Sequence, residues 1–104
     1  MNTWILDTWL VHPGHEDEFI TRWTDLMQWT IQEVPGIAGA IPLYRDGQQM
    51  NRFFCPIAWE SAEAIAAWRA SQGYQSRIEQ IQRLCTDLEV RTLVLATRLS
   101  PHTQ

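Results

Sequence analysis

"TWILDTWLV" occupies residues 3–11, and its β-branched and aromatic residues favour a β-strand. Successive side chains of a strand point to opposite faces of a sheet, so the odd and even positions form two separate sets. The odd set carries Asp7 and Trp9 between aliphatic residues, and the even set carries Trp4 and two leucines. A strand with two largely apolar faces predicts a sheet that is covered on both sides.

A helix is expected next, over about residues 15–34, after a turn at 12–14 that contains proline and glycine. Three acidic residues at 16–18 would lie in its first turn, where the helix dipole stabilises negative charge. Apolar residues recur at helical spacing and predict the buried stripe of this helix. They are Phe19, Trp23, Leu26, Met27, Ile31 and Val34. Pro35-Gly36 would end the helix.

The rest of the chain predicts a hairpin, a broken helix and a last strand. The hairpin has strands at 37–45 and 51–59, with Asp46-Gly47 in its loop. Ser61 would cap a helix from 62 to about 70, which breaks near Ser71 and Gly73 and resumes from 74 to 88. The last strand is expected at 89–99, and the tail, residues 100–104, is expected to be frayed.

This order of elements, β-α-β-β-α-β, predicts a ferredoxin-like α+β fold in a single domain of residues 1–104. Right-handed crossovers place the helices on one face of a four-stranded antiparallel sheet. The other face would expose one of the two apolar sets of residues 3–11, and an apolar surface of that size marks an interface. The simplest cover is a second copy of the same sheet. We therefore expect a homodimer, a dimeric α/β barrel with a cavity under each pair of helices.

Composition excludes several classes of protein. The net charge is -4 and all 8 basic residues are arginine, which argues against a nucleic-acid surface and leaves no lysine for Schiff-base chemistry. Cys55 and Cys85 form no CxxC motif, so a reducing compartment is expected. No apolar run approaches ~18 residues, so no membrane span is expected. With no basic leader before residues 3–11, we expect a cytoplasmic protein.

Asp7 is the most informative polar residue because it stands among apolar neighbours on a strand. Burial would raise its pKa and make it a better general base near neutral pH. The alternative is a structural ion pair with Arg91 or Arg98 across the sheet. His12 and His15 flank a turn, but too few other ligands stand near them for a metal site, so no metal is expected.

Four aromatic residues have two interpretations. Trp68 and Tyr74 lie near the break in the second helix, where a flat substrate could stack on the indole while the phenol orients an oxygen. Aromatic residues at helical spacing also serve commonly as core. Trp9 and Trp59 are further candidates for substrate binding, although Trp59, at the end of a strand, favours core packing.

Several short motifs make the chain, over residues 3 to about 99, resemble the antibiotic biosynthesis monooxygenase (ABM) family of dimeric α/β barrels. Pro13-Gly14 follows the first strand and Pro35-Gly36 follows the first helix. Trp59-x-Ser61-x-x-Ala64 then leads to Trp68-x-x-Ser71-x-x-Tyr74. The resemblance implies an oxygenase of phenolic or quinol substrates without metal or flavin, a haem-degrading protein, or an uncharacterised relative.

The branches of this family differ in their site residues. The haem-degrading branch has an asparagine, a tryptophan and an iron-ligating histidine at the positions of Asp7, Trp68 and Ile78. Isoleucine cannot ligate iron, so haem degradation is disfavoured. The polyketide-oxidising branch has the pair found here as Trp68 and Tyr74, but also an asparagine where this chain has Ala64.

A later arginine of the polyketide-oxidising branch has two candidate counterparts here, Arg83 and Arg91. The resemblance thus implies a cofactor-independent monooxygenase that oxidises a small phenolic, quinol or polyketide-type aromatic substrate with O2. Asp7, Trp68 and Tyr74 would be catalytic, and Trp9, Trp59 and Arg91 would bind substrate. No cofactor is expected, because the substrate supplies the electrons. The alternatives are a non-catalytic carrier or sensor of a small apolar molecule, and a residual haem binder.

Overall fold

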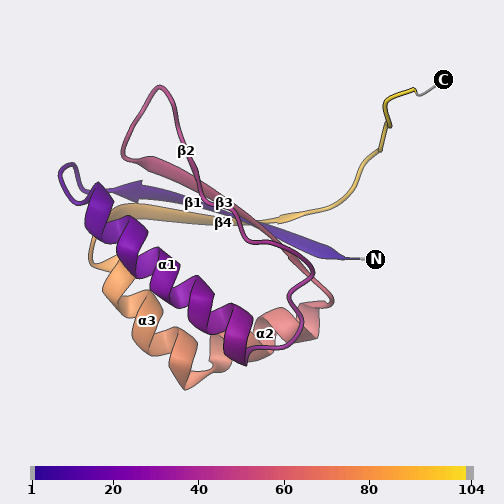
Figure 1. The fold of residues 1–104 in the computed structure, drawn as a ribbon, viewed down its shortest axis with the longest axis horizontal. Helices are drawn as coiled ribbons and strands as arrows, with labels where there is room; N and C mark the ends of the chain where they lie inside the picture. Colours follow the sequence, from indigo (N-terminus) through magenta and orange to yellow (C-terminus); the bar gives the residue numbers. More distant parts are fainter. Residues whose placement is uncertain (1, 103–104) are drawn as a thin grey trace.

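The computed structural model describes residues 2–102, which form a four-stranded antiparallel sheet with three helices on one face (Figure 1). In chain order the elements are β1 (Thr3–Val11), α1 (Glu16–Glu33), β2 (Tyr44–Arg45), β3 (Arg52–Trp59), α2 (Ala62–Ala70), α3 (Gln72–Gln82) and β4 (Cys85–Leu93). The strands lie side by side in the order β2-β3-β1-β4. This arrangement confirms the predicted ferredoxin-like α+β fold.

The first strand, β1, lies in the middle of the sheet, between β3 and β4. Asp7 is opposite Cys55 on β3 and Val90 on β4. The odd positions of β1 from residue 5 onward are at most 6% exposed, whereas Trp4 in the even set is 43% exposed. Asp7 and Trp9 therefore belong to the face that the helices cover, and the even set forms the outer face of the sheet.

Helix α1 packs on the sheet through the predicted stripe, with one change. Phe19, Trp23, Leu26 and Met27 are buried, but Ile31 is 57% exposed and Thr30 is buried in its place. A buried hydroxyl needs hydrogen-bond partners. Thr30 has two, since its Oγ1 donates to the carbonyl of Leu26 and accepts from the indole of Trp68.

The predicted hairpin strand at 37–45 is much shorter in the structure. Only Tyr44–Arg45 pairs with β3 as a strand, and Ile37 makes a single bridge to Trp59. The backbone between them is irregular, with Gly39 at a positive φ of 137°. Pro42, which has no N–H to donate to a ladder, lies in the same segment. The prediction was wrong in length, and the short strand that forms lies at the edge of the sheet.

The second helical region and the last strand also have different boundaries. The helix expected to run to residue 88 ends at Gln82, and β4 begins at Cys85 and ends at Leu93. Cys85 is already opposite Val11, so β4 pairs with β1 along nearly its whole length. It supplies hydrogen-bond partners to the backbone groups of β1 on the side away from β3. The strand ends where β1 begins, because Leu93 is opposite Trp4 and residues beyond it have no partner strand.

An apolar outer face remains on the side of the sheet away from the helices. Trp4 is opposite Leu93, and Tyr44 is opposite Phe54, so these four side chains point to this side. Trp4, Tyr44 and Leu93 are 42–59% exposed. We call these four residues the outer apolar face. In a single chain it is uncovered.

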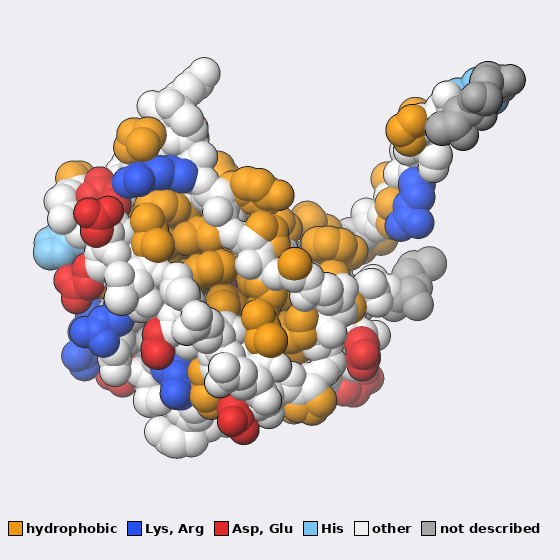
Figure 2. Space-filling view, in the orientation of Figure 1, with side chains coloured by type: hydrophobic (Ala, Val, Ile, Leu, Met, Phe, Trp, Pro, Cys, Tyr) orange, Lys and Arg blue, Asp and Glu red, His pale blue; other side chains and the backbone are white. Residues whose placement is uncertain are grey.

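The segment after β4 runs away from the body of the molecule (Figures 1 and 2). Residues 94–102 have no regular structure, and Val94 and Leu99 are 86% and 90% exposed. Figure 2 shows that hydrophobic side chains continue along this arm. The expectation of a frayed tail at 100–104 agrees with the irregular backbone of 100–102, while residues 103–104 lie outside the described part of the chain.

Candidate active site

Asp7 lies at the centre of the helix-covered face and is 6% exposed. Burial raises the pKa of its carboxyl from 3.8 to about 6, and the positive charge of Arg69 opposes the rise. Its Oδ1 atom is buried and accepts no hydrogen bond within the described residues. The predicted alternative, a structural ion pair with Arg91 or Arg98, is absent from residues 2–102. The structure thus holds a desolvated carboxylate with an unused acceptor.

Trp68 and Tyr74 come together beside the C-terminal end of α2. The two rings are 4.5 Å apart between centroids and meet edge to face. Trp68 is fixed on its other sides, because its Nε1 donates to Thr30 Oγ1 at 3.0 Å and its ring packs on Trp59 at 4.9 Å. Ser71 holds both residues through its hydroxyl, which donates to the Trp68 carbonyl and accepts from the Tyr74 N–H.

Tyr74 is an electrostatic neighbour of Asp7. Burial raises the pKa of its phenol, the negative charge of Asp7 raises it further, and Arg69 lowers it. Burial raises the pKa of the Cys55 thiol to about 12, and the negative charge of Asp7 contributes to this rise. The charge of Asp7 therefore affects the ionisation of Tyr74, and Trp68 packs against the phenol of Tyr74.

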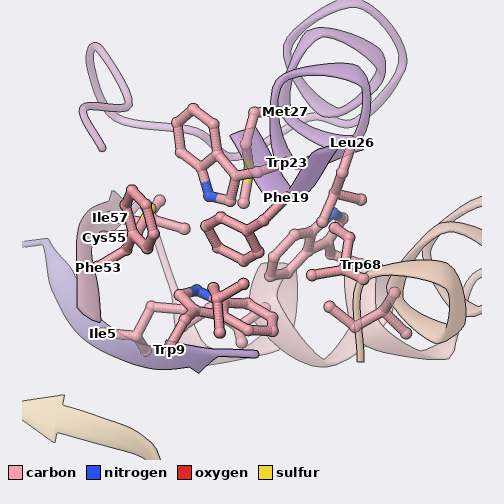
Figure 3. Packing of buried hydrophobic residues seen from close by; sticks show 14 of the residues in the cluster. Ile5, Trp9, Phe19, Trp23, Leu26, Met27, Phe53, Cys55, Ile57 and Trp68 are labelled. Atoms are coloured by element: carbon pink, nitrogen blue, oxygen red, sulfur yellow. The ribbon is translucent and has the colours of Figure 1, made fainter. Parts of the chain in front are cut away.

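Trp9 and Trp59 are core residues in the single chain. Trp9 packs on Phe19 with ring centroids 5.5 Å apart, and Figure 3 shows Trp68 entering the same apolar space from α2. Trp59 is fully buried and packs on Trp68. The indole N–H groups of Trp9 and Trp59 are nevertheless buried without an acceptor among the described residues. The interior thus holds two unused indole donors as well as the unused acceptor of Asp7.

The structure does not bring Arg91 to Asp7. Arg91 is opposite Leu6, on the outer side of the sheet, where it is exposed and pairs with Glu89. Arg83 is also exposed and pairs with Glu79 at 3.4 Å. The arginine whose charge acts on Asp7 is Arg69, which sequence analysis missed. Its position directly after Trp68 was the one available signal.

A pocket of about 350 Å³ opens between the C-terminal end of α1 and helix α2. Its lining is mainly apolar and includes Trp29, Ala64, Ala67 and Trp68. Ala64 occupies the position at which the polyketide-oxidising branch of the ABM family has an asparagine. Trp68 is shared, since it forms a wall of this pocket and also packs on Tyr74. The pocket therefore reaches Trp68 but not Asp7 or Tyr74, which are not among its lining residues.

No other reactive centre stands out in the described part of the chain. Among residues 2–102, no three His, Cys, Asp or Glu side chains converge as metal ligands would. Burial raises the pKa of Cys85 to about 11, so its thiol, like that of Cys55, stays protonated near neutral pH. Ile78, at the position of the haem ligand, is buried in the core. None of the three helices in residues 2–102 combines the length and hydrophobicity that a membrane span requires.

Comparison with known proteins gives one family and a common fold. A sequence model of the family described as antibiotic biosynthesis monooxygenase matches residues 6–80. No curated protein matches the chain.

Solved structures are similar in fold at low identity. SnoaB, a cofactor-independent oxygenase from Streptomyces nogalater, is 18% identical over 96% of this chain and 98% of its own, with a TM-score of 0.85. A structure described as an antibiotic biosynthesis monooxygenase is 18% identical over 91% of this chain and 99% of its own, with a TM-score of 0.80. A conserved protein from Methanosarcina mazei Go1 is 12% identical over 89% and 91%, with a TM-score of 0.81.

Proposed function

The chain belongs to the antibiotic biosynthesis monooxygenase family, and from this premise we propose that it is a cofactor-independent monooxygenase. Its substrate would be a small phenolic, quinol or polyketide-type aromatic molecule, oxidised by O2. Asp7 would act as the base, Trp68 would pack on the aromatic ring and Tyr74 would hydrogen-bond an oxygen of the substrate.

One observation carries this proposal, the unused acceptor of Asp7. A buried carboxylate oxygen without a donor is unfavourable, and such groups concentrate at functional sites. A phenolic O–H supplies the missing donor. Burial also helps the proton transfer, because it narrows the gap between the pKa of Asp7 and that of a phenol near 10 from about six units to about four. This lowers the cost of deprotonation by about 3 kcal/mol.

The reaction can be written without a cofactor because the substrate anion is itself the reductant. Asp7 takes the phenolic proton, and the resulting anion passes one electron to O2. The substrate radical and superoxide combine at a ring carbon that carries hydrogen, which gives a peroxide anion. Asp7 returns its proton to this peroxide. Loss of water then leaves a carbonyl at that carbon, so one oxygen atom enters the product and the other leaves as water.

Trp68 and Tyr74 have supporting roles in this scheme. The Trp68 ring is held by Thr30 and Trp59, so it offers a fixed surface to a flat molecule without an ordering cost on binding. The burial that raises the pKa of Tyr74 keeps its phenol protonated, so it can donate to an oxygen of the substrate. A dry interior protects the radical pair from water.

The working form is proposed to be a homodimer. The outer apolar face, which is exposed in a single chain, would be buried against the same face of a second copy. The exposed apolar residues of the arm after β4, such as Val94 and Leu99, would extend this contact.

Oxygen consumption with a panel of simple quinols and tricyclic phenols tests the enzymatic role. We expect Asp7→Asn to lower the rate at least ~100-fold, the usual contribution of a general base. Asp17→Asn, an exposed substitution in the first turn of α1, is the matched control and should leave the rate unchanged. The enzymatic proposal fails if Asp7→Asn consumes oxygen as fast as the wild type.

A non-catalytic carrier is the second candidate, and the pocket beside α2 favours it. This pocket is open whereas Asp7 is enclosed, and Trp9 and Trp59 fill much of the interior. A carrier would bind the aromatic molecules of the same panel without consuming oxygen, and Asp7→Asn would leave their affinity unchanged.

A further inference from the structure

We propose that the pocket between the C-terminal end of α1 and helix α2 binds a small flat organic cation, with Glu33 and Glu60 holding its charged group. This inference goes beyond the proposed oxidation, because it concerns a binding site that needs neither O2 nor Asp7.

The walls of the pocket suit a flat apolar body. Two indoles, Trp29 and Trp68, form part of its lining, and Ala64 and Ala67 leave space where larger residues of α2 would fill it. The volume of about 350 Å³ is in the lower range of ligand pockets, which fits a molecule of two fused rings.

The wall at Trp29 is already in place before a ligand arrives. A Cβ atom at Gly73 would lie 2.0 Å from the Trp29 ring, so the indole lies directly on the backbone of α3. The guanidinium of Arg77 covers the same ring at 4.7 Å from its centroid, and Arg77 pairs with Asp25. Because a cation already stacks on Trp29, the charged group of a ligand is expected at the carboxylates rather than over this ring.

The charge of the pocket is negative from three sources. Glu33 and Glu60 line it, and neither forms an ion pair within the described part of the chain. The third source is the C-terminal end of α1, an 18-residue helix with no basic residue in its last turn. The dipole places partial negative charge at this end, where a cation is normally found and a glutamate is unfavourable.

Glu33 is therefore at a position that lowers the stability of the free protein. A bound cation would offset both the helix dipole and the carboxylates. Trp68 then connects this pocket with the proposed active site, since the ring that contacts the ligand also packs on Tyr74.

Isothermal titration calorimetry with three matched naphthalenes tests this inference at low salt. The probes are 1-naphthylmethylamine, which is a cation near neutral pH, the neutral 1-naphthalenemethanol, and the anion 1-naphthoate. We expect the amine to bind roughly 3- to 10-fold more tightly than the alcohol, because Glu33 and Glu60 are exposed carboxylates, and the naphthoate to bind most weakly. Equal affinity of amine and alcohol, or tighter binding of the naphthoate, would overturn the proposal.

Three variants locate the site. Glu33→Gln combined with Glu60→Gln should reduce the affinity for the amine to that for the alcohol, while Glu33→Gln alone should raise the melting temperature of the free protein. Glu63→Gln, an exposed change in the first turn of α2 that removes one negative charge outside the pocket, is the control and should keep the preference for the amine. Ala67→Leu should weaken all three probes by filling the pocket. Retention of the amine preference in the double variant, or of full affinity in Ala67→Leu, would place the binding elsewhere and refute the inference.

Discussion

Replacing Asp7 by asparagine should change the pH dependence of stability by a predictable amount. The pKa of Asp7 is raised from 3.8 to about 6 by burial, so the folded protein binds a proton at this site more tightly than the unfolded chain does. Between these two values the folded state therefore loses stability as the pH rises, and above about 6 the loss is complete. Two pKa units at 1.36 kcal/mol each give a loss of about 3 kcal/mol.

An asparagine side chain cannot ionise, so the Asp7→Asn variant lacks this loss. Its free energy of unfolding, relative to that of the wild type, should rise by about 3 kcal/mol between about pH 3.5 and about pH 8. The buried amide of the variant adds its own cost, but that cost does not change with pH and cancels from the comparison. Urea unfolding of both proteins at equal protomer concentration across this range supplies the measurement, since assembly would otherwise alter the apparent stability.

Asp17→Asn is the control, because Asp17 is exposed. A stability difference between Asp7→Asn and wild type that stays constant across this whole pH range would show that folding does not raise the pKa of Asp7. It would mean that water reaches the carboxylate and that Asp7 is not a desolvated base.

Three other outcomes follow from the structure. The rate of quinol oxidation should rise with pH through about 6 and then level off, because only deprotonated Asp7 accepts a proton; a flat profile in the wild type would exclude this role. Ser71→Ala should lower the free energy of unfolding by about 1 kcal/mol, through loss of the cap that joins Trp68 to Tyr74, whereas Ser76→Ala should change it by less than about 0.5 kcal/mol. Trp4→Glu should convert a dimer to a monomer in sedimentation, while Ile31→Glu, on the exposed side of α1, should not; an unchanged dimer with Trp4→Glu would place the interface elsewhere.

The fold could be predicted because local patterns and topology agree. The two largely apolar faces of residues 3–11 predicted a sheet that is covered on both sides. In the structure the helices cover one of these faces, and the other belongs to the outer apolar face. The boundaries of the helices and strands could not be predicted as well, because they depend on pairing with strands that are distant in the sequence. Cys85 and Leu88 continue a helical spacing, yet they belong to β4, because the free edge of β1 requires a partner strand.

Candidate site residues could be predicted only where their surroundings are set by a single strand or by the break between two consecutive helices. Asp7 is buried because it lies on the same face of β1 as Ile5 and Trp9, and Trp68 and Tyr74 meet because Ser71 caps the helices on both sides of it. The face of the sheet on which Trp9 and Arg91 each lie could be assigned only from the register between β1 and β4. The influence of Arg69 on Asp7 depends on how α2 is rotated against the sheet, and neither composition nor spacing specifies that rotation.

Asp7 is a desolvated carboxylate with an unused acceptor, and we propose that it takes a phenolic proton from the substrate. Carbon-13 NMR of the Asp7 carboxyl, assigned by comparison with Asp7→Asn, follows its titration directly in the intact protein. We expect a midpoint near 6 and a change in chemical shift when a phenol binds. A midpoint near the ordinary 3.8, with no response to phenols, would contradict it.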